Sequence, residues 1–258
     1  MLCTGVMGTQ ASCRVYEEYL DGFYFNISAL GVAAIKNDAD AVDDLVKDGC
    51  DVNYNGTGIR WINMKYVSDT LDKDYTNEEY SYEDAYDEED FSILYGETAL
   101  HIAVNDGGKE VVKQIVKIPG VDIDAKSGRG ETALHDAAGY GLSDVIETLH
   151  SAGADLDSIN NDGYTPLHSA AMYGQVEGVK TLALLGADLD TLGGNETVTA
   201  LTMAVQMGFT DVVEILVEMG ANPDVKDATG KTARDWAAEW GDEATKVILG
   251  KSITNMVR

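Results

Sequence analysis

The stretch GETALHDAAGYG, residues 130–141, decides the fold of this 258-residue chain because it recurs along the sequence. Versions of its central part begin at five threonines: Thr98, Thr132, Thr165, Thr199 and Thr232. These threonines are separated by 34, 33, 34 and 33 residues. Self-similarity at a constant period of this length predicts a solenoid, in which each unit buries its apolar face against its neighbours.

Each part of the repeated block has a physical reason. The threonine is expected to start a helix, where its hydroxyl can bond backbone N–H groups that lack a partner within the helix. The leucine and the alanines are expected to pack between adjacent repeats. The glycine at the end of the block, Gly141 in this copy, is expected to turn the chain toward a second helix. That second helix, for example residues 211–218, alternates apolar and polar positions at helical spacing.

The blocks TALHDAA at 132–138 and TPLHSAA at 165–171 resemble the ankyrin repeat, and the resemblance covers roughly residues 25 to 250. It implies an all-α ankyrin-repeat solenoid of about six repeats, each a helix-turn-helix with a β-hairpin finger. It also implies that the motif histidines, His101, His135 and His168, hydrogen-bond neighbouring backbone and fix the turns. The resemblance indicates a fold and a way of binding, but no partner.

The repeat pattern divides the chain into five segments. Residues 1–24 are expected to form an N-terminal segment with a capping helix, since Val15, Tyr16, Tyr19 and Leu20 have the spacing of one helix face. Residues 25–53 form a degenerate first repeat, and residues 54–95 are an acidic, tyrosine-rich insertion. Repeats two to six occupy residues 96–250, and residues 251–258 are a C-terminal tail.

The insertion follows from counting residues between equivalent positions. Asp155 and Thr165 are ten steps apart, whereas the equivalent Asp51 and Thr98 are 47 steps apart. Residues 69–90 hold 11 acidic side chains against one lysine, a net charge of −10 in 22 residues. A high density of charges of the same sign, combined with few apolar residues, favours disorder. One interpretation of the insertion is therefore an inert solvated loop.

The tyrosines of the insertion support a second interpretation, in which the segment binds a basic protein surface. Acidic groups would attract the partner, and tyrosines would provide large contact areas that can also meet a cation. The candidate binding residues here are tyrosines and acidic residues, namely Tyr75, Tyr80, Tyr82, Tyr86, Glu78, Glu79, Asp87, Glu88, Glu89 and Asp90.

A second group of candidate binding residues precedes the inter-helix glycines. In the ankyrin family this position is expected to face the inner, concave surface, and here it holds Asp106, Tyr140, Tyr173, Met207 and Trp240. Aromatic and Met side chains of this kind are typical anchors of protein interfaces. The alternative is that each tyrosine packs on the neighbouring repeat. Arg129 and Tyr164 at the finger tips are expected to border the group, with Glu131, Asn161 and Asp162 beside them.

Charge limits the classes of partner. The chain carries 45 acidic and 18 basic residues, a formal net charge of −27. Such a surface is repelled by nucleic acid and by anionic membranes and attracted to basic proteins. The three cysteines suggest no disulfide framework, and with the lack of a persuasive signal peptide they favour an intracellular setting: the cytoplasm, the nucleus or a host cell.

No catalytic arrangement, cofactor motif or metal-ligand spacing is recognisable, so we expect a non-enzymatic protein. The main hypothesis is an interaction module that binds a basic protein through its concave face and the insertion, which could inhibit that partner. One alternative is a mimic of nucleic acid that inhibits a nucleic-acid-binding protein, as a factor of a pathogen, virus or symbiont. The other is a general scaffold with an inert insertion.

Overall fold

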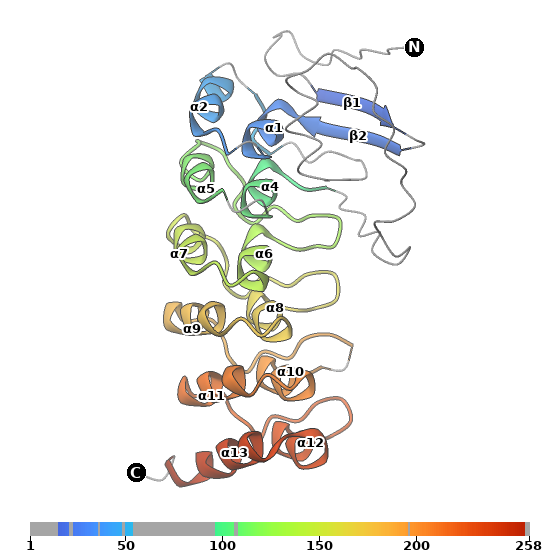
Figure 1. The fold of residues 1–258 in the computed structure, drawn as a ribbon, viewed down its shortest axis with the longest axis vertical. Coiled ribbons are helices and arrows are strands. Elements are labelled where there is room, and N and C mark those ends of the chain that lie inside the picture. Colours follow the sequence, from blue (N-terminus) through green and yellow to red (C-terminus); the bar gives the residue numbers. More distant parts are fainter. Residues whose placement is uncertain are drawn as a thin grey trace, which may run out of the picture.

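A computed structural model of the chain describes residues 15–20, 23–35, 37–47, 50–53, 96–105, 108–195 and 197–255. Helices follow one another in pairs through these residues, and the pairs stack into an elongated column (Figure 1). The first helices of the pairs are α1 (Ala29–Ile35), α4 (Ala99–Asn105), α6 (Ala133–Gly139), α8 (Pro166–Met172), α10 (Ala200–Met207) and α12 (Ala233–Trp240). The second helices are α2 (Ala39–Lys47), α5 (Lys109–Ile115), α7 (Ser143–Ser151), α9 (Val176–Leu185), α11 (Thr210–Glu218) and α13 (Glu243–Asn255).

The predicted helix starts are confirmed. A helix begins one residue after each of the five threonines of the repeated block, and α1 begins one residue after Ser28. Thr132 has an extended backbone with φ −92° and ψ 163°, as expected of a residue that precedes a helix. Gly141 and Gly174, which follow α6 and α8, have φ of +68° and +69°, a region that glycine enters without steric strain.

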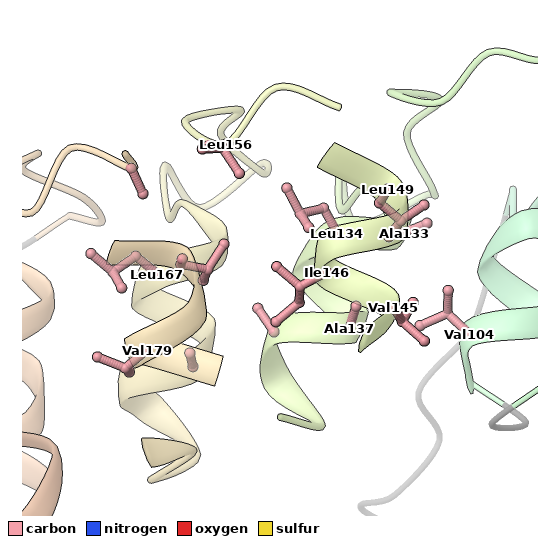
Figure 2. Packing of buried hydrophobic residues seen from close by; sticks show 14 of the residues in the cluster. Val104, Ala133, Leu134, Ala137, Val145, Ile146, Leu149, Leu156, Leu167 and Val179 are labelled. Carbon is pink, nitrogen blue, oxygen red and sulfur yellow. The ribbon is translucent and has the colours of Figure 1, made fainter. Parts of the chain in front are cut away.

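The column forms because first helices pack against first helices and second helices pack against second helices. The helix α6 packs against α4 and α8, and α7 packs against α5 and α9. Leucines fill the space between the layers, and Leu134 and Leu167 are each about 1% exposed. Figure 2 shows these two side chains together with Ile146 and Leu149 of α7 in the buried cluster. The buried residues therefore form one continuous apolar strip along the column.

The first helix pair joins this column directly, although residues 54–95 separate it from the second pair in sequence. The helix α1 packs against α4, and α2 packs against α5. A hydrogen bond from backbone to side chain crosses the same boundary: the Oδ1 of Asn53 accepts from the N–H of Asp122 at 2.7 Å. The same link recurs one repeat later, from the N–H of Asp155 to Asp124 at 3.1 Å. The stacking at this boundary thus resembles that between later pairs.

The connections between pairs project to one side of the column, next to the first helices (Figure 1). They carry the positions predicted to be β-hairpin fingers. In two of them the chain pairs with itself through an isolated antiparallel bridge, between Gly193 and Val198 and between Lys226 and Thr232. The other described fingers are turns without such a bridge.

Two expectations about the ends of the chain and one about its cysteines are wrong. Residues Val15–Leu20, expected to be a capping helix, form strand β1, which pairs antiparallel with β2 (Phe23–Ser28). The short run of aromatic and β-branched residues fits a strand as well as a helix, and pairing with β2 decides between them. The helix α13 extends to Asn255, beyond the predicted boundary at 250. Cys50 is disulfide-bonded, which removes the support that the cysteines lent to a reducing compartment.

Candidate protein-binding surface

The histidines of the repeated block connect each first helix to the next finger. In α6 the Nδ1 of His135 accepts a hydrogen bond from the N–H of Thr132 at 3.1 Å. The opposite nitrogen, Nε2, lies 3.0 Å from the backbone oxygen of Tyr164 in the next finger. His101 and His168 make the equivalent pairs of contacts. The structural role implied by the family resemblance is therefore confirmed for all three histidines.

These contacts require neutral imidazoles, since one nitrogen accepts and the other donates. Burial favours the uncharged ring and lowers the pKa of His101 and of His135 to about 4, while the hydrogen bonds to the carbonyls of Glu131 and Tyr164 oppose this shift. The pKa of His168 is lowered for the same reason. These buried rings thus serve the fold, and they lie beneath the surface that a partner can reach.

Adjacent fingers also contact each other directly. The N–H of Asn161 donates to the carbonyl of Arg129 at 3.0 Å, and the Asn161 amide donates to the carbonyl of Gly128 at 3.0 Å. Gly130, with φ of +73°, lies so close that an added Cβ would be 2.4 Å from the Oδ1 of Asn161. The finger tips are therefore held at a fixed distance from one another, which gives the surface above them a defined shape.

Large hydrophobic side chains are exposed at the last position of the first helices or directly after it. Tyr140 is 58% exposed, Tyr173 62%, Met207 52% and Trp240 65%. We call these four residues the exposed row. They occur once per repeat in adjacent first helices, and packed helices lie about 8–10 Å apart. Four of the residues predicted from the sequence to lie on the surface at this position are therefore exposed.

Tyr173 combines the two roles that the sequence left open. An added Cβ on Gly139 would lie 3.3 Å from the Cδ2 of Tyr173, so this ring rests on the end of the preceding first helix. More than half of the side chain nevertheless remains exposed. Packing on the neighbour and presentation to solvent are thus compatible, and the contact limits the rotamers that the exposed ring can adopt.

Trp240 is supported in a similar way at the C-terminal end of the row. Its ring centroid lies 4.6 Å from that of buried Trp236, with a tilt of 52°. The indole N–H of Trp236 donates to Asp227 at 2.6 Å, and the Nζ of Lys231 lies 4.1 Å from the Trp236 ring centroid. Lys231 also forms an ion pair of 2.7 Å with Glu239. Trp240 therefore rests on side chains that are held by contacts with one another. Its side chain loses little conformational freedom when a partner covers it.

The comparisons with known proteins agree with this architecture. The family model described as "Ankyrin repeats (3 copies)" matches residues 81–160, 100–192 and 184–257. The chain belongs to the ankyrin-repeat family. Its fold is similar to that of an ankyrin repeat domain from Acinetobacter baumannii AYE, with a TM-score of 0.63, 24% identity, and coverage of 86% of this chain and 96% of that one.

A second similar structure is the ankyrin repeat domain of Bcl-3, described as a unique member of the IkappaB protein family. Its TM-score is 0.67 at 24% identity, and the match covers 86% of this chain and 85% of that one. The TM-scores show a shared fold, and at 24% identity they show the fold alone. A search of the curated proteins finds no match.

Two predicted residues of the ankyrin fingers have different surroundings. Arg129 is exposed, whereas Tyr164 is half-buried. An added Cβ on Gly194 would lie 2.5 Å from the Tyr164 hydroxyl, and the Tyr164 ring centroid is 5.6 Å from that of His168. Tyr164 thus packs between fingers, and only part of it can meet a partner.

Other hydrophobic residues are exposed that were not predicted from the sequence. Ile159 and Leu192 occupy equivalent finger positions 33 residues apart, and both are exposed, as is Phe209 after the inter-helix Gly208. The constant period could have revealed the first two. Asp106 and all candidates of the insertion, between Tyr75 and Asp90, lie outside the described residues.

The described part of the chain offers little for other site types. It contains no group of three or more histidine, cysteine, aspartate or glutamate side chains that could hold a metal ion. Among the same residues, every helix is too short or too polar to cross a lipid bilayer.

Proposed function

We propose that this ankyrin-repeat protein is a non-enzymatic interaction module that binds a partner protein with a basic surface. Ankyrin repeats present an extended surface to protein partners. The observation that carries the proposal is the exposed row, in which Tyr140, Tyr173, Met207 and Trp240 present anchor-type side chains at one position of successive repeats. Two of its members, Tyr173 and Trp240, are supported from beneath by neighbouring residues.

The charge of the chain supports a basic partner rather than a second copy. A formal net charge of −27 opposes self-association and accelerates the approach of a positively charged surface. The exposed row would supply contact area that resists dissociation, and the acidic insertion would add attraction. In this proposal the partner covers the first-helix ends and the neighbouring finger tips, including Arg129. Inhibition of the partner would follow if the covered surface is its own functional site.

The experiment compares capture of partners from the native source by the wild-type protein and by three variants. Trp240→Ala and Tyr173→Ala each remove a member of the exposed row. Leu184→Ala is the matched control, because Leu184 is 68% exposed but lies on the second helix α9. We expect a basic protein that is retained by wild type and Leu184→Ala and loses at least tenfold affinity in both row variants.

Two results would contradict the proposal. One is a partner whose affinity is equal for wild type, Trp240→Ala and Tyr173→Ala. The other is a partner that is acidic and whose binding strengthens with salt, because a basic surface predicts weakening by screening. Competition by nucleic acid for the captured protein would favour the mimic alternative, since the acidic groups would then occupy a phosphate site.

A further inference from the structure

A hollow of about 250 Å³ lies at the turns between the first and second helices of two adjacent repeats. It adjoins the exposed row, because its residues Gly174 and Gly208 directly follow Tyr173 and Met207. The remaining lining residues are Val176, Phe209, Thr210, Asp211 and Val212. The hollow therefore lies where a partner seated on the middle of the row would reach the edge of the column.

Phe209 gives this turn its apolar wall. In repeats two to six, the residue after the inter-helix glycine is Gly108, Leu142, Gln175, Phe209 and Asp242, so an aromatic ring occurs here and in none of the other four. An added Cβ on Gly174 would lie 2.8 Å from the Cδ1 of Phe209, which places the ring directly against the backbone of the preceding turn. Phe209 is still 37% exposed, so a ligand can lie on it.

The polar groups that line the hollow favour a positively charged ligand. Among the described residues, Asp211 is its single charged lining side chain, and no ion pair with a described lysine or arginine neutralises it. The hydroxyl of Thr210 is already engaged, at 3.0 Å from both Asp242 and Thr245. An apolar wall beside a carboxylate without an ion pair to a described residue fits a side chain with an aliphatic stem and a cationic head.

We propose that the hollow lined by Phe209 and Asp211 receives an arginine or lysine side chain of the partner. Its stem lies on Phe209, and its charge meets the Asp211 carboxylate. This inference rests on the proposed function, since it assigns to one basic side chain of the partner a specific place beside the exposed row. The guanidinium of arginine can also stack on the Phe209 ring, which favours arginine over lysine.

The test uses single amino acids as probes, so it does not require the partner. Two-dimensional ¹H–¹⁵N NMR spectra of the full-length protein are recorded during titration with N-acetyl-arginine amide. N-acetyl-norleucine amide, which has an aliphatic side chain without the charge, is titrated in parallel. We expect arginine to shift the backbone amides of Gly174, Gly208 and Thr210 several times more than norleucine does, with weak, millimolar-range affinity.

Two variants and one matched control locate the effect. Asp211→Asn removes the carboxylate, and Phe209→Gln introduces the residue found at the equivalent turn, Gln175. Glu177→Gln removes one charge at the same helix position of the preceding repeat, outside the lining of the hollow. We expect at least a fivefold weaker response in the first two variants and an unchanged response in the control. The rest of each spectrum shows whether the variant is folded.

Equal shifts from arginine and norleucine would overturn the inference, and so would an equal effect of Asp211→Asn and Glu177→Gln. Either result leaves the proposed function standing, because the capture experiment depends on Trp240 and Tyr173. Conversely, arginine binding in the hollow can be observed even if no partner is captured. The two failures are therefore distinguishable.

Discussion

The Nε2 of His135 lies 3.0 Å from the backbone oxygen of Tyr164, and this contact joins helix α6 to the finger of the next repeat. Tyr164 was a candidate for contact with a partner, and its backbone turns out to hold the repeats together. Because each buried histidine spans two repeats, loss of its neutral form would weaken the interface between them rather than one helix alone.

Stability is predicted to fall in mildly acidic solution because of these histidines. The pKa of His135 is about 4 in the folded protein against 6.5 for an ordinary histidine, so the folded state prefers the neutral ring. The stabilisation is present above pH 6.5 and is lost as the pH falls from there toward 4. For a single histidine with these values, linkage gives a loss of about 2 kcal/mol in the free energy of unfolding at pH 5.

Urea unfolding at pH 7.5 and pH 5 measures this loss. The control is His135→Thr, since Thr202 takes the same position in α10 and bonds Thr199 there. The variant is expected to be less stable at pH 7.5 but to lose about 2 kcal/mol less than wild type on acidification. Identical losses in the two proteins would mean that His135 does not titrate in this range. The comparison is needed because the many carboxylates also begin to titrate at low pH.

The buried leucines of the repeated block are predicted to carry much of the stability. Leu134→Ala and Leu167→Ala should each lower the free energy of unfolding by about 2–5 kcal/mol, as truncation of a buried leucine does. Leu184→Ala provides the control, because Leu184 is exposed on α9, and its effect should stay within about 0.5 kcal/mol. Similar effects at Leu134 and Leu184 would contradict the observed burial.

The repeat architecture was predictable because its signal occurs many times in the sequence. Each copy of the threonine-led block predicts a helix start, and the first four copies also predict a buried leucine. The structure has all five helix starts at the expected residues, and the four leucines are buried. Residues 15–20 offered no such repetition. Their spacing was compatible with a helix or a strand, and the decision came from pairing with residues 23–28.

The surface was predictable only in part. The period identified Tyr140, Tyr173, Met207 and Trp240 as equivalent positions, but their exposure depends on how neighbouring side chains pack. Tyr164 shows the difference, because a predicted tip residue is half-buried against Gly194. The hollow beside Phe209 arises from two glycines and one ring in different repeats. A combination of that kind has no signature in a single copy of the motif.

Gly130 is predicted to tolerate substitution less well than Gly153. Both glycines have positive φ, so alanine introduces backbone strain of roughly 1–2 kcal/mol at either site. At Gly130 the added Cβ would also lie 2.4 Å from the Asn161 side chain and 2.7 Å from the Asn161 nitrogen, whereas at Gly153 no atom lies within 4 Å. Thermal unfolding should therefore show a larger loss for Gly130→Ala. Equal losses would indicate that the fingers separate easily.

The last prediction concerns residues 69–90, which lie outside the described part of the chain. Deleting them should leave the free energy of unfolding almost unchanged, because α1 already packs on α4 and Asn53 already bonds Asp122. The interval from Asp51 to Thr98 would still exceed the ten steps between Asp155 and Thr165. A large loss of stability would show that the segment contributes to the packed structure.

Within the insertion, the acidic groups are expected to affect the association rate constant and the tyrosines the dissociation rate constant, which can be measured once a partner has been identified. Replacing Glu78, Glu79, Asp87, Glu88, Glu89 and Asp90 by Gln or Asn should mainly slow association and flatten its salt dependence, because exposed charges steer the encounter. Replacing Tyr80, Tyr82 and Tyr86 by alanine should mainly accelerate dissociation, because buried aromatic residues are typical anchors. Surface plasmon resonance at low and moderate salt separates the two effects. Unchanged rate constants for the deletion variant at both salt concentrations would identify the segment as an inert loop and leave binding to the repeats alone.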